Sequence, residues 1–328
     1  MTERWPTDIV EAREAAMLER LRTVESELVP LRAAVSGARH PWGWILAAII
    51  FGGGVATFFL FKQATSYGLV SGLLTLAGVI WSGRHLYRFG KILGTKRDAL
   101  DAALIRDVLQ VTEHQVDASA LDIYQEAGFF GHWAKANTLR RFSAEGRELL
   151  LAHLTKTESY TDSDGNRKTR TVTVFRGLLF TLPAPFALGP AITTVSTGSR
   201  PRPHGRFAPA SKPDRIKTAS LDFNTHHKVY TTDSVLGHGI LDPDRTMRFI
   251  NMEHDLSDAT RWGRSSYAML FTDGRVHVAV SNVTLPVLAN FPESDALEKA
   301  LRSAHAPLTL PAVMAHHLRL PPNSETPP

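Results

Sequence analysis

Two long uncharged stretches follow one another near the N-terminus, and they limit what this chain can fold into more than any other feature does. One runs from Pro41 to Phe61 and the other from Gln63 to Gly83, so each is 21 residues long, with Lys62 between them. About 20 helical residues cross the ~30 Å hydrocarbon core of a bilayer. Backbone groups in lipid must pair within their own segment, which favours helices. We therefore expect a transmembrane helical hairpin over residues 41–83.

The charges beside this hairpin predict its orientation. Cations gather on both outer flanks, whereas the connection between the stretches holds Lys62 alone. Because lysine and arginine remain on the cytoplasmic side of a membrane, we expect both termini in the cytoplasm. Neither stretch contains Asp, Glu, Arg, Lys or His. Such groups mark ion paths and proton relays, so their absence argues against a pump or transporter.

Small residues in the second stretch indicate close helix packing. Gly68 and Gly72 have the spacing that lets helix backbones approach in lipid. The contact could join the two helices of one hairpin or two protomers, and the sequence leaves both alternatives open.

Residues 1–40 precede the hairpin and predict a cytoplasmic amphipathic helix over residues 8–35. Six apolar residues recur at alternating steps of four and three, which is the a/d spacing of a coiled coil. They are Met17, Leu21, Val24, Leu28, Leu31 and Val35. This row is a candidate oligomer seam, or it packs on the chain's own cytoplasmic part. Pro30 is expected to kink or end the helix near Val29.

Basic residues cluster at two places after the hairpin. The net charge of +5 is mild for 328 residues, which disfavours a dedicated nucleic-acid binder. A juxtamembrane helix over residues 84–117 and a proline-rich loop over residues 200–215 are candidate contacts for anionic lipids. Their cations are Arg84, Arg88, Lys91, Lys96, Arg97, Arg200, Arg202 and Arg206. The alternatives are a plain cytoplasmic stop signal and a solvated connector.

Residues 118–305 read as one cytoplasmic α+β domain with a mainly antiparallel sheet. Turn residues at Asp162–Asn166 and at Asp273-Gly274 predict two β-hairpins. Strand is expected from Lys217 to Thr232, and Asp242 followed by Pro243 predicts a helix start. A helix is expected over residues 293–304, followed by a proline-rich disordered tail at 306–328.

The sequence offers little that points to chemistry. Cysteine is absent, which excludes disulfides, thiolate metal sites and cysteine nucleophiles. No phosphate-binding loop, serine-hydrolase or zinc-protease motif is present. His226 and His227 are adjacent, and neighbouring strand residues point to opposite faces, which is poor geometry for chelation. We therefore predict no catalytic, cofactor or metal site.

Three short elements resemble a bacterial family known as a domain of unknown function, family 3137. The first is the F-x-G-L-x-F element at Phe175–Phe180. The second has His227 in an aromatic slot, then Val229-Tyr230, Asp233, Leu241 and Pro243, with Leu236–Gly239 in place of an E-A-R-Y-like stretch. The third is Leu270–Gly274 followed by Ala279. The resemblance covers roughly residues 42–300 and implies a two-span hairpin with an α+β domain, without implying an activity.

Together these features predict a two-pass protein of the bacterial inner membrane that is not an enzyme. Its cytoplasmic domain is expected to bind a protein partner, or to form a homo-oligomer that organises a complex. The alternative is a sensor of anionic lipid or a small ligand at the membrane surface. An undetected hydrolase or transferase is the least favoured reading.

Overall fold

The computed structural model describes residues 7–36, 84, 87–88, 90–144, 146–184, 191–260, 266–291 and 293–318. The chain forms two compact units. The larger comprises Met1–Met17, Leu109–Pro286 and Lys299–Pro328, and the smaller comprises Leu18–Val108 and Val287–Glu298.

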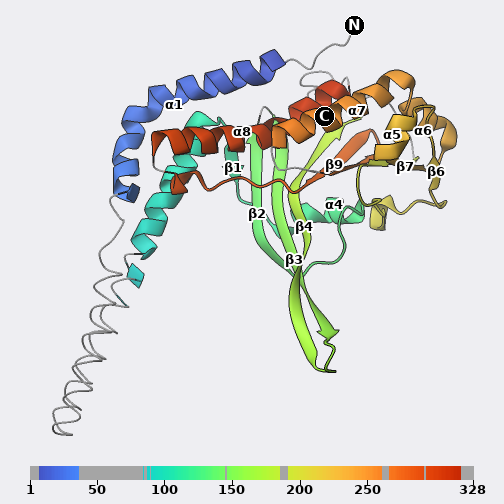
Figure 1. The fold of residues 1–328 in the computed structure, drawn as a ribbon, viewed down its shortest axis with the longest axis horizontal. Coiled ribbons are helices and arrows are strands. Elements are labelled where there is room, and N and C mark those ends of the chain that lie inside the picture. The colour runs from blue at the N-terminus through green and yellow to red at the C-terminus, as the bar shows by residue number, and fades with distance from the viewer. Residues whose placement is uncertain are drawn as a thin grey trace. The chain divides into compact units, whose positions relative to one another are not determined.

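The larger unit is built on a nine-stranded sheet in the order β1-β2-β3-β4-β9-β8-β5-β7-β6 (Figure 1). Every pairing in this sheet is antiparallel. The α+β class with a large antiparallel sheet is therefore confirmed. The strands are β1 Thr112–His114, β2 Lys135–Ala144, β3 Arg147–Thr161, β4 Arg167–Pro183, β5 Thr193–Ser196, β6 Asp214–Ile216, β7 Lys228–Thr231, β8 Tyr267–Thr272 and β9 Arg275–Ser281.

Both hairpins that the sequence predicts are present. Between β3 and β4, the Asp162 carboxylate accepts hydrogen bonds from the amides of Asp164 and Asn166, at 3.0 and 2.8 Å. Between β8 and β9, Asp273 and Gly274 have φ of 46° and 68°. Positive φ at both central residues is the geometry that a two-residue hairpin turn requires.

The helical segments are divided between the two units, and α1 and α8 each contribute residues to both. The α-helices are α1 Thr7–Ser36, α4 Asp122–Glu126, α5 Leu221–His226, α6 Ser234–Ile240, α7 Pro243–Thr260 and α8 Ser294–His317. Residues 90–103 are also helical. Short turns of other kinds are η1 Leu104–Val108, η2 Ala118–Leu121, η3 Gly205–Phe207 and η4 Leu288–Asn290.

The register of the strands separates two buried faces of the sheet. One face, the α4 face, carries Leu150, Leu179 and Ala279 under Leu121 and Tyr124 of η2 and α4. The other, the α7 face, carries Tyr267 beneath α5 and α7, where its ring lies beside that of His227. Directly paired residues in an antiparallel sheet share a face, so the pairing fixes the face of each side chain.

The smaller unit is helical within the described residues. An Arg20 guanidinium nitrogen donates to the Val108 carbonyl oxygen at 3.0 Å. The Asp101 carboxylate accepts a hydrogen bond from the Leu288 amide at 2.7 Å. Leu28, Leu100 and Leu104 are almost fully buried, so the unit has an apolar centre of its own.

Two boundaries drawn from the sequence are wrong. The chain over 217–232 is not one strand, because the Ser220 hydroxyl caps α5 by accepting from the Phe223 amide at 3.2 Å. The helix predicted over residues 84–117 does not extend to residue 117, since it passes into η1 and then into β1. Of the two outcomes expected at Pro30, the helix does not end there, because α1 continues through the proline to Ser36.

The predicted tail at 306–328 begins too early. Helix α8 continues to His317 with Pro307 and Pro311 inside it. Each proline removes one helical hydrogen bond and crowds the preceding turn. Leu308, Leu310 and Met314 are buried on the same segment, and burial of such side chains at ~1.5–3 kcal/mol each offsets that cost.

The predicted hairpin over 41–83 lies outside the described residues. Among the helices that the structure does describe, none is both long and apolar enough to span a bilayer.

Candidate functional site

The β3–β4 hairpin extends well beyond the rest of the sheet (Figure 1). Strand β2 pairs with β3 only as far as Thr155, and β9 pairs with β4 only from Gly177 onward. Strands β3 and β4 continue to pair with each other to Thr161 and Arg167. Residues 156–172 therefore form a two-stranded ribbon, which we call the arm.

Two hydrogen bonds mark where the neighbouring strands leave the arm. On the β3 side, the Ala134 amide donates to the Thr155 carbonyl oxygen at 2.9 Å. On the β4 side, the Asn282 amide donates to the Arg176 carbonyl oxygen at 2.7 Å. Asn282 has φ of 61°, a left-handed conformation that turns the chain away from β4. Across the described ranges, no further strand pairs with the outer edge of either arm strand.

The two faces of the arm differ in chemistry. One face carries hydroxyl side chains in cross-strand pairs, with Thr157 opposite Thr171 and Ser159 opposite Thr169. The other face carries charges, and Glu158 accepts from Lys156 at 2.8 Å and from Arg170 at 3.3 Å. These cations hold the pKa of Glu158 below its usual value. The arm is thus polar on both faces and has no hydrophobic face to bury.

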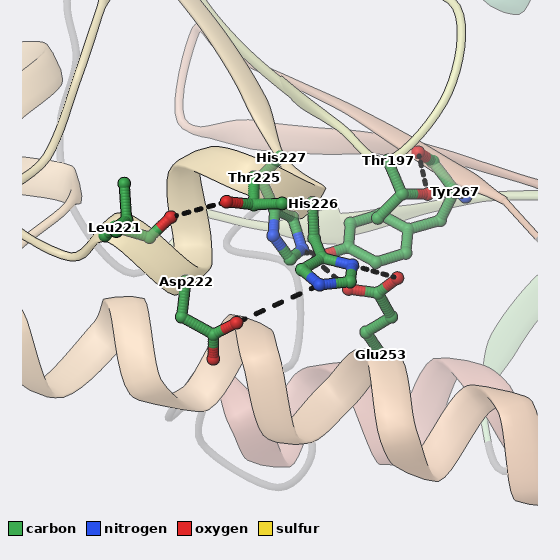
Figure 2. A network of polar contacts seen from close by, with 8 residues as sticks. All are labelled: Thr197, Leu221, Asp222, Thr225, His226, His227, Glu253 and Tyr267. Carbon is green, nitrogen blue, oxygen red and sulfur yellow. Dashed lines mark hydrogen bonds and ion pairs between the residues drawn. The ribbon is translucent and has the colours of Figure 1, made fainter.

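A second candidate lies on the α7 face, around two adjacent histidines (Figure 2). His227 Nε2 lies 2.6 Å from the Tyr267 hydroxyl and 3.7 Å from a Glu253 carboxylate oxygen. His226 lies between the carboxylates of Glu253 and Asp222, at 3.7 and 3.9 Å. The His227 ring stacks on Phe223, with centroids 4.4 Å apart and planes 3° apart.

Burial sets the protonation of this group. Burial lowers the pKa of His227 to about 4 and raises the pKa of Tyr267 well above 10. Both side chains are therefore neutral near pH 7 and can share one ordinary hydrogen bond. His227 Nδ1 is buried without a hydrogen-bond partner in the described part of the chain. His227 thus stacks on an aromatic ring at the position where the family resemblance expects an aromatic residue.

His277 forms a comparable group on the α4 face. Its Nδ1 lies 2.9 Å from the Thr181 hydroxyl, which lies 3.3 Å from the Tyr124 hydroxyl. The Phe207 ring covers the imidazole at 5.1 Å. Burial lowers the pKa of His277 to about 4 and raises that of Tyr124 to about 12. Both histidines therefore lie as neutral rings inside packed layers.

The basic loop is held against the larger unit by its backbone. The Arg202 amide donates to the Gly128 carbonyl oxygen at 3.2 Å, and the His204 amide to that of Glu126 at 2.7 Å. Arg206 forms an ion pair with Glu126 at 2.8 Å. The Arg200 guanidinium lies over the Tyr230 ring at 3.9 Å, which is a close cation–π contact. Arg202 and Arg206 are exposed.

The structure places the other residues proposed from sequence as follows. In the predicted seam, Met17, Leu28 and Val35 are buried, and Leu21, Val24 and Leu31 are half-buried, within one chain. Gly68 and Gly72 lie outside the described residues. The five cations that the sequence predicts beside the hairpin are exposed, and they are Arg84, Arg88, Lys91, Lys96 and Arg97.

Sequence reasoning missed the arm and the Arg200–Tyr230 contact. The arm's strands and turn are visible in the sequence, but the ends of β2 and β9 decide where the ribbon loses its neighbours. A usable signal was the alternation of threonine with charged residues from Lys156 to Thr173, since a strand with no apolar side does not cover a core. No comparable signal links Arg200 to Tyr230.

Within the described ranges, no three His, Asp or Glu side chains are grouped so as to hold a metal ion. Residues 173–305 match the family model described as "Protein of unknown function (DUF3137)". No curated protein and no solved structure matches the chain.

Proposed function

We propose that this chain is a membrane-anchored binding protein rather than an enzyme. Its residues 173–305 match a family of proteins of unknown function, which assigns no activity. The sequence-predicted hairpin over 41–83 would fix it in the bacterial inner membrane with both termini in the cytoplasm. The larger unit would then present the arm to a protein partner.

The observation that carries this proposal is the arm itself. An isolated two-stranded ribbon is marginally stable in water, and open strand edges are usually shortened, bulged or covered. The arm keeps residues 156–172 paired without either neighbour. It contains no proline. A ribbon of this kind is suited to contact with a second protein.

The buried histidines support the non-enzymatic part of the proposal. His227 and His277 are each 2% exposed and lie under aromatic rings. General bases must reach the proton they abstract, and these two rings are enclosed by protein on all sides. They are better explained as polar members of the packed layers.

Shortening the arm tests the function directly. Thr155 and Thr173 are directly opposite, so an Asn-Gly pair can replace residues 156–172 as a two-residue turn. Tagged full-length protein would be purified in detergent, and the mass of the complex measured. We expect a stoichiometric partner with the native arm and its loss in the shortened variant. Asp164→Ser at the arm tip is the matched control and should keep the partner.

The partner's survival after shortening, with an unchanged melting temperature, would overturn the proposed role of the arm. The second candidate function, binding of anionic lipid at the membrane surface, would then be favoured. The exposed Arg202 and Arg206 on a backbone-anchored loop favour contact with anionic headgroups at the membrane surface. Full-length protein in phosphatidylglycerol vesicles should then show slower hydrogen exchange over residues 198–217 than in phosphatidylcholine vesicles, and added salt should remove the difference.

A further inference from the structure

The two outer edges of the arm are not equivalent. On β4, every charged side chain from Arg167 to Arg176 is a cation, namely Arg167, Lys168, Arg170 and Arg176. The acids that pair with them lie across the ribbon or in the turn, since Lys168 contacts Asp162 at 2.7 Å and Arg170 contacts Glu158. The β3 edge instead carries one cation and one acid, Lys156 and Glu158.

The β4 edge is also the longer one. It is unpaired from Arg167 to Phe175, whereas the β3 edge is unpaired only from Lys156 to Thr161. Its residues are mainly threonine, valine and phenylalanine between the cations, which favour extended backbone. The pairing of β9 with β4 ends at Arg176, because the chain turns away at Asn282. A strand added beyond this point would continue the line of β9 along β4.

We propose that the outer edge of β4 from Arg167 to Phe175 accepts an extended acidic segment of another protein as an added strand; this deepens the proposed function and rests on it. Main-chain hydrogen bonds would supply the contact, as in other cases of strand addition. Acidic side chains on the added strand would lie opposite the β4 cations. A second copy of this chain is the poorer occupant, because β4 against β4 puts cations opposite cations.

The charge pattern identifies the partner's chemistry. Like charges directly opposite destabilise a strand pair, and opposite charges stabilise it. The β4 cations are exposed, whereas the side chains of Asp162 and Glu158, the present partners of Lys168 and Arg170, are 12% and 33% exposed. The exposed cations remain accessible to carboxylates on an added strand. A neutral or basic segment would gain the backbone contacts only.

Position-by-position photocrosslinking in cells tests the added strand. Full-length protein would carry a benzophenone amino acid at Thr169, Thr171 or Thr173, one position at a time. Successive positions are two residues apart on one face. An added strand should give adducts in a single partner segment, with the attachment site moving by two residues per step. Thr157 and Ser159, opposite Thr171 and Thr169 on β3, are the matched controls and should give far weaker adducts.

Charge reversal tests the acidic character of the segment. Arg167→Glu with Lys168→Glu should lower the adduct yield at Thr171 about tenfold or more, since like charges opposite one another destabilise a strand pair. Lys212→Glu with Lys217→Glu makes the same charge change on the two sides of β6 and should leave the yield unchanged.

Several results would overturn the inference. The inference fails if the attachment site does not move by two residues per position, or if no adduct forms. It also fails if the partner segment carries no net negative charge, or if the β3 controls give equal adduct yields. Suppose that the shortened arm loses the partner while the attachment sites fail to move by two residues per position. The arm would then still bind the partner, and only the inference of strand addition would fail. If shortening the arm leaves the partner in place, the proposed function fails as well.

Discussion

The amide of Asn282 and the carbonyl of Arg176 form the last hydrogen bond between β9 and β4, at 2.7 Å. Beyond it, the left-handed backbone of Asn282 turns the chain away while β4 continues for nine more residues. The open edge of β4 therefore begins at a defined residue, and the chain conformation at Asn282 creates it.

The His227–Tyr267 hydrogen bond predicts a non-additive pair of mutations. His227→Phe keeps the stack on Phe223 but leaves the buried Tyr267 hydroxyl without its 2.6 Å partner, so it should cost about 1–3 kcal/mol. Tyr267→Phe in the same background removes that hydroxyl and should recover most of the loss. Chemical denaturation of the two single variants and the double variant measures the coupling. Additive losses would show that the hydrogen bond is not the cause.

The two buried histidines predict a stability that falls in mild acid. Their pKa is about 4 in the folded chain and 6.5 as the ordinary value. Below pH 6.5 these two histidines bind protons in the unfolded chain but remain neutral in the folded chain. The free energy of unfolding therefore decreases with falling pH until about pH 4. Above pH 6.5 both states are neutral and the histidines add no pH dependence.

Melting temperatures between pH 4.5 and 7.5 check this dependence. The full effect is on the order of 3 kcal/mol for each histidine. His277→Gln removes one titrating ring and should reduce the slope, whatever it does to the stability at pH 7.5. His132→Gln, at an exposed position, is the control and should keep the native slope. An identical slope in both variants would contradict the assignment.

Gly128 predicts a local defect in the basic loop. Its φ is +77°, and a Cβ there would lie 2.2 Å from the Arg202 backbone. Gly128→Ala should therefore cost about 2 kcal/mol or more, because backbone must move in addition to the left-handed strain. Gly146 has φ of +73° with nothing within 4 Å of its Cβ position, so Gly146→Ala should cost only about 1 kcal/mol. Faster hydrogen exchange at residues 202–206 in the first variant alone would confirm the contact.

The apolar row of α1 gives a prediction that separates its two interpretations. Leu28 is 3% exposed within one chain, so Leu28→Ala should destabilise the protein by about 2–5 kcal/mol without changing its oligomeric mass. Val29 is 54% exposed, and Val29→Ala should change stability by no more than about 0.5 kcal/mol. A lower oligomeric mass in Leu28→Ala, at unchanged stability, would instead support the interpretation of this row as an oligomer seam.

Local chemistry made part of this fold predictable. Asp162–Asn166 and Asp273-Gly274 identify their turns because the turn geometry is encoded in two to five adjacent residues. The N-terminus of α7 was visible in the same way, and the Arg245 amide does donate to the Asp242 carboxylate at 2.8 Å.

Other features depend on residues distant in sequence. The alternation around residues 217–232 resembles a strand, but a capped helix of six residues interrupts it. Pro307 and Pro311 signal a break, yet burial of their neighbours keeps α8 intact. The arm follows from the lengths of β2 and β9, and no local pattern in β3 or β4 determines those lengths.

The register of β3 and β4 shifts between Leu154 and Thr155, where Val174 is the extra residue of β4. The bulge absorbs this residue, so Thr173 still lies opposite Thr155 and the threonines of β4 share a face with Thr157 and Ser159. Pairing without the bulge would place Val174 opposite Thr155 and would bring Lys168, Arg170 and Val172 to the face that the threonines hold. One bulge outside the arm therefore decides which side chains a partner meets on each face of the arm.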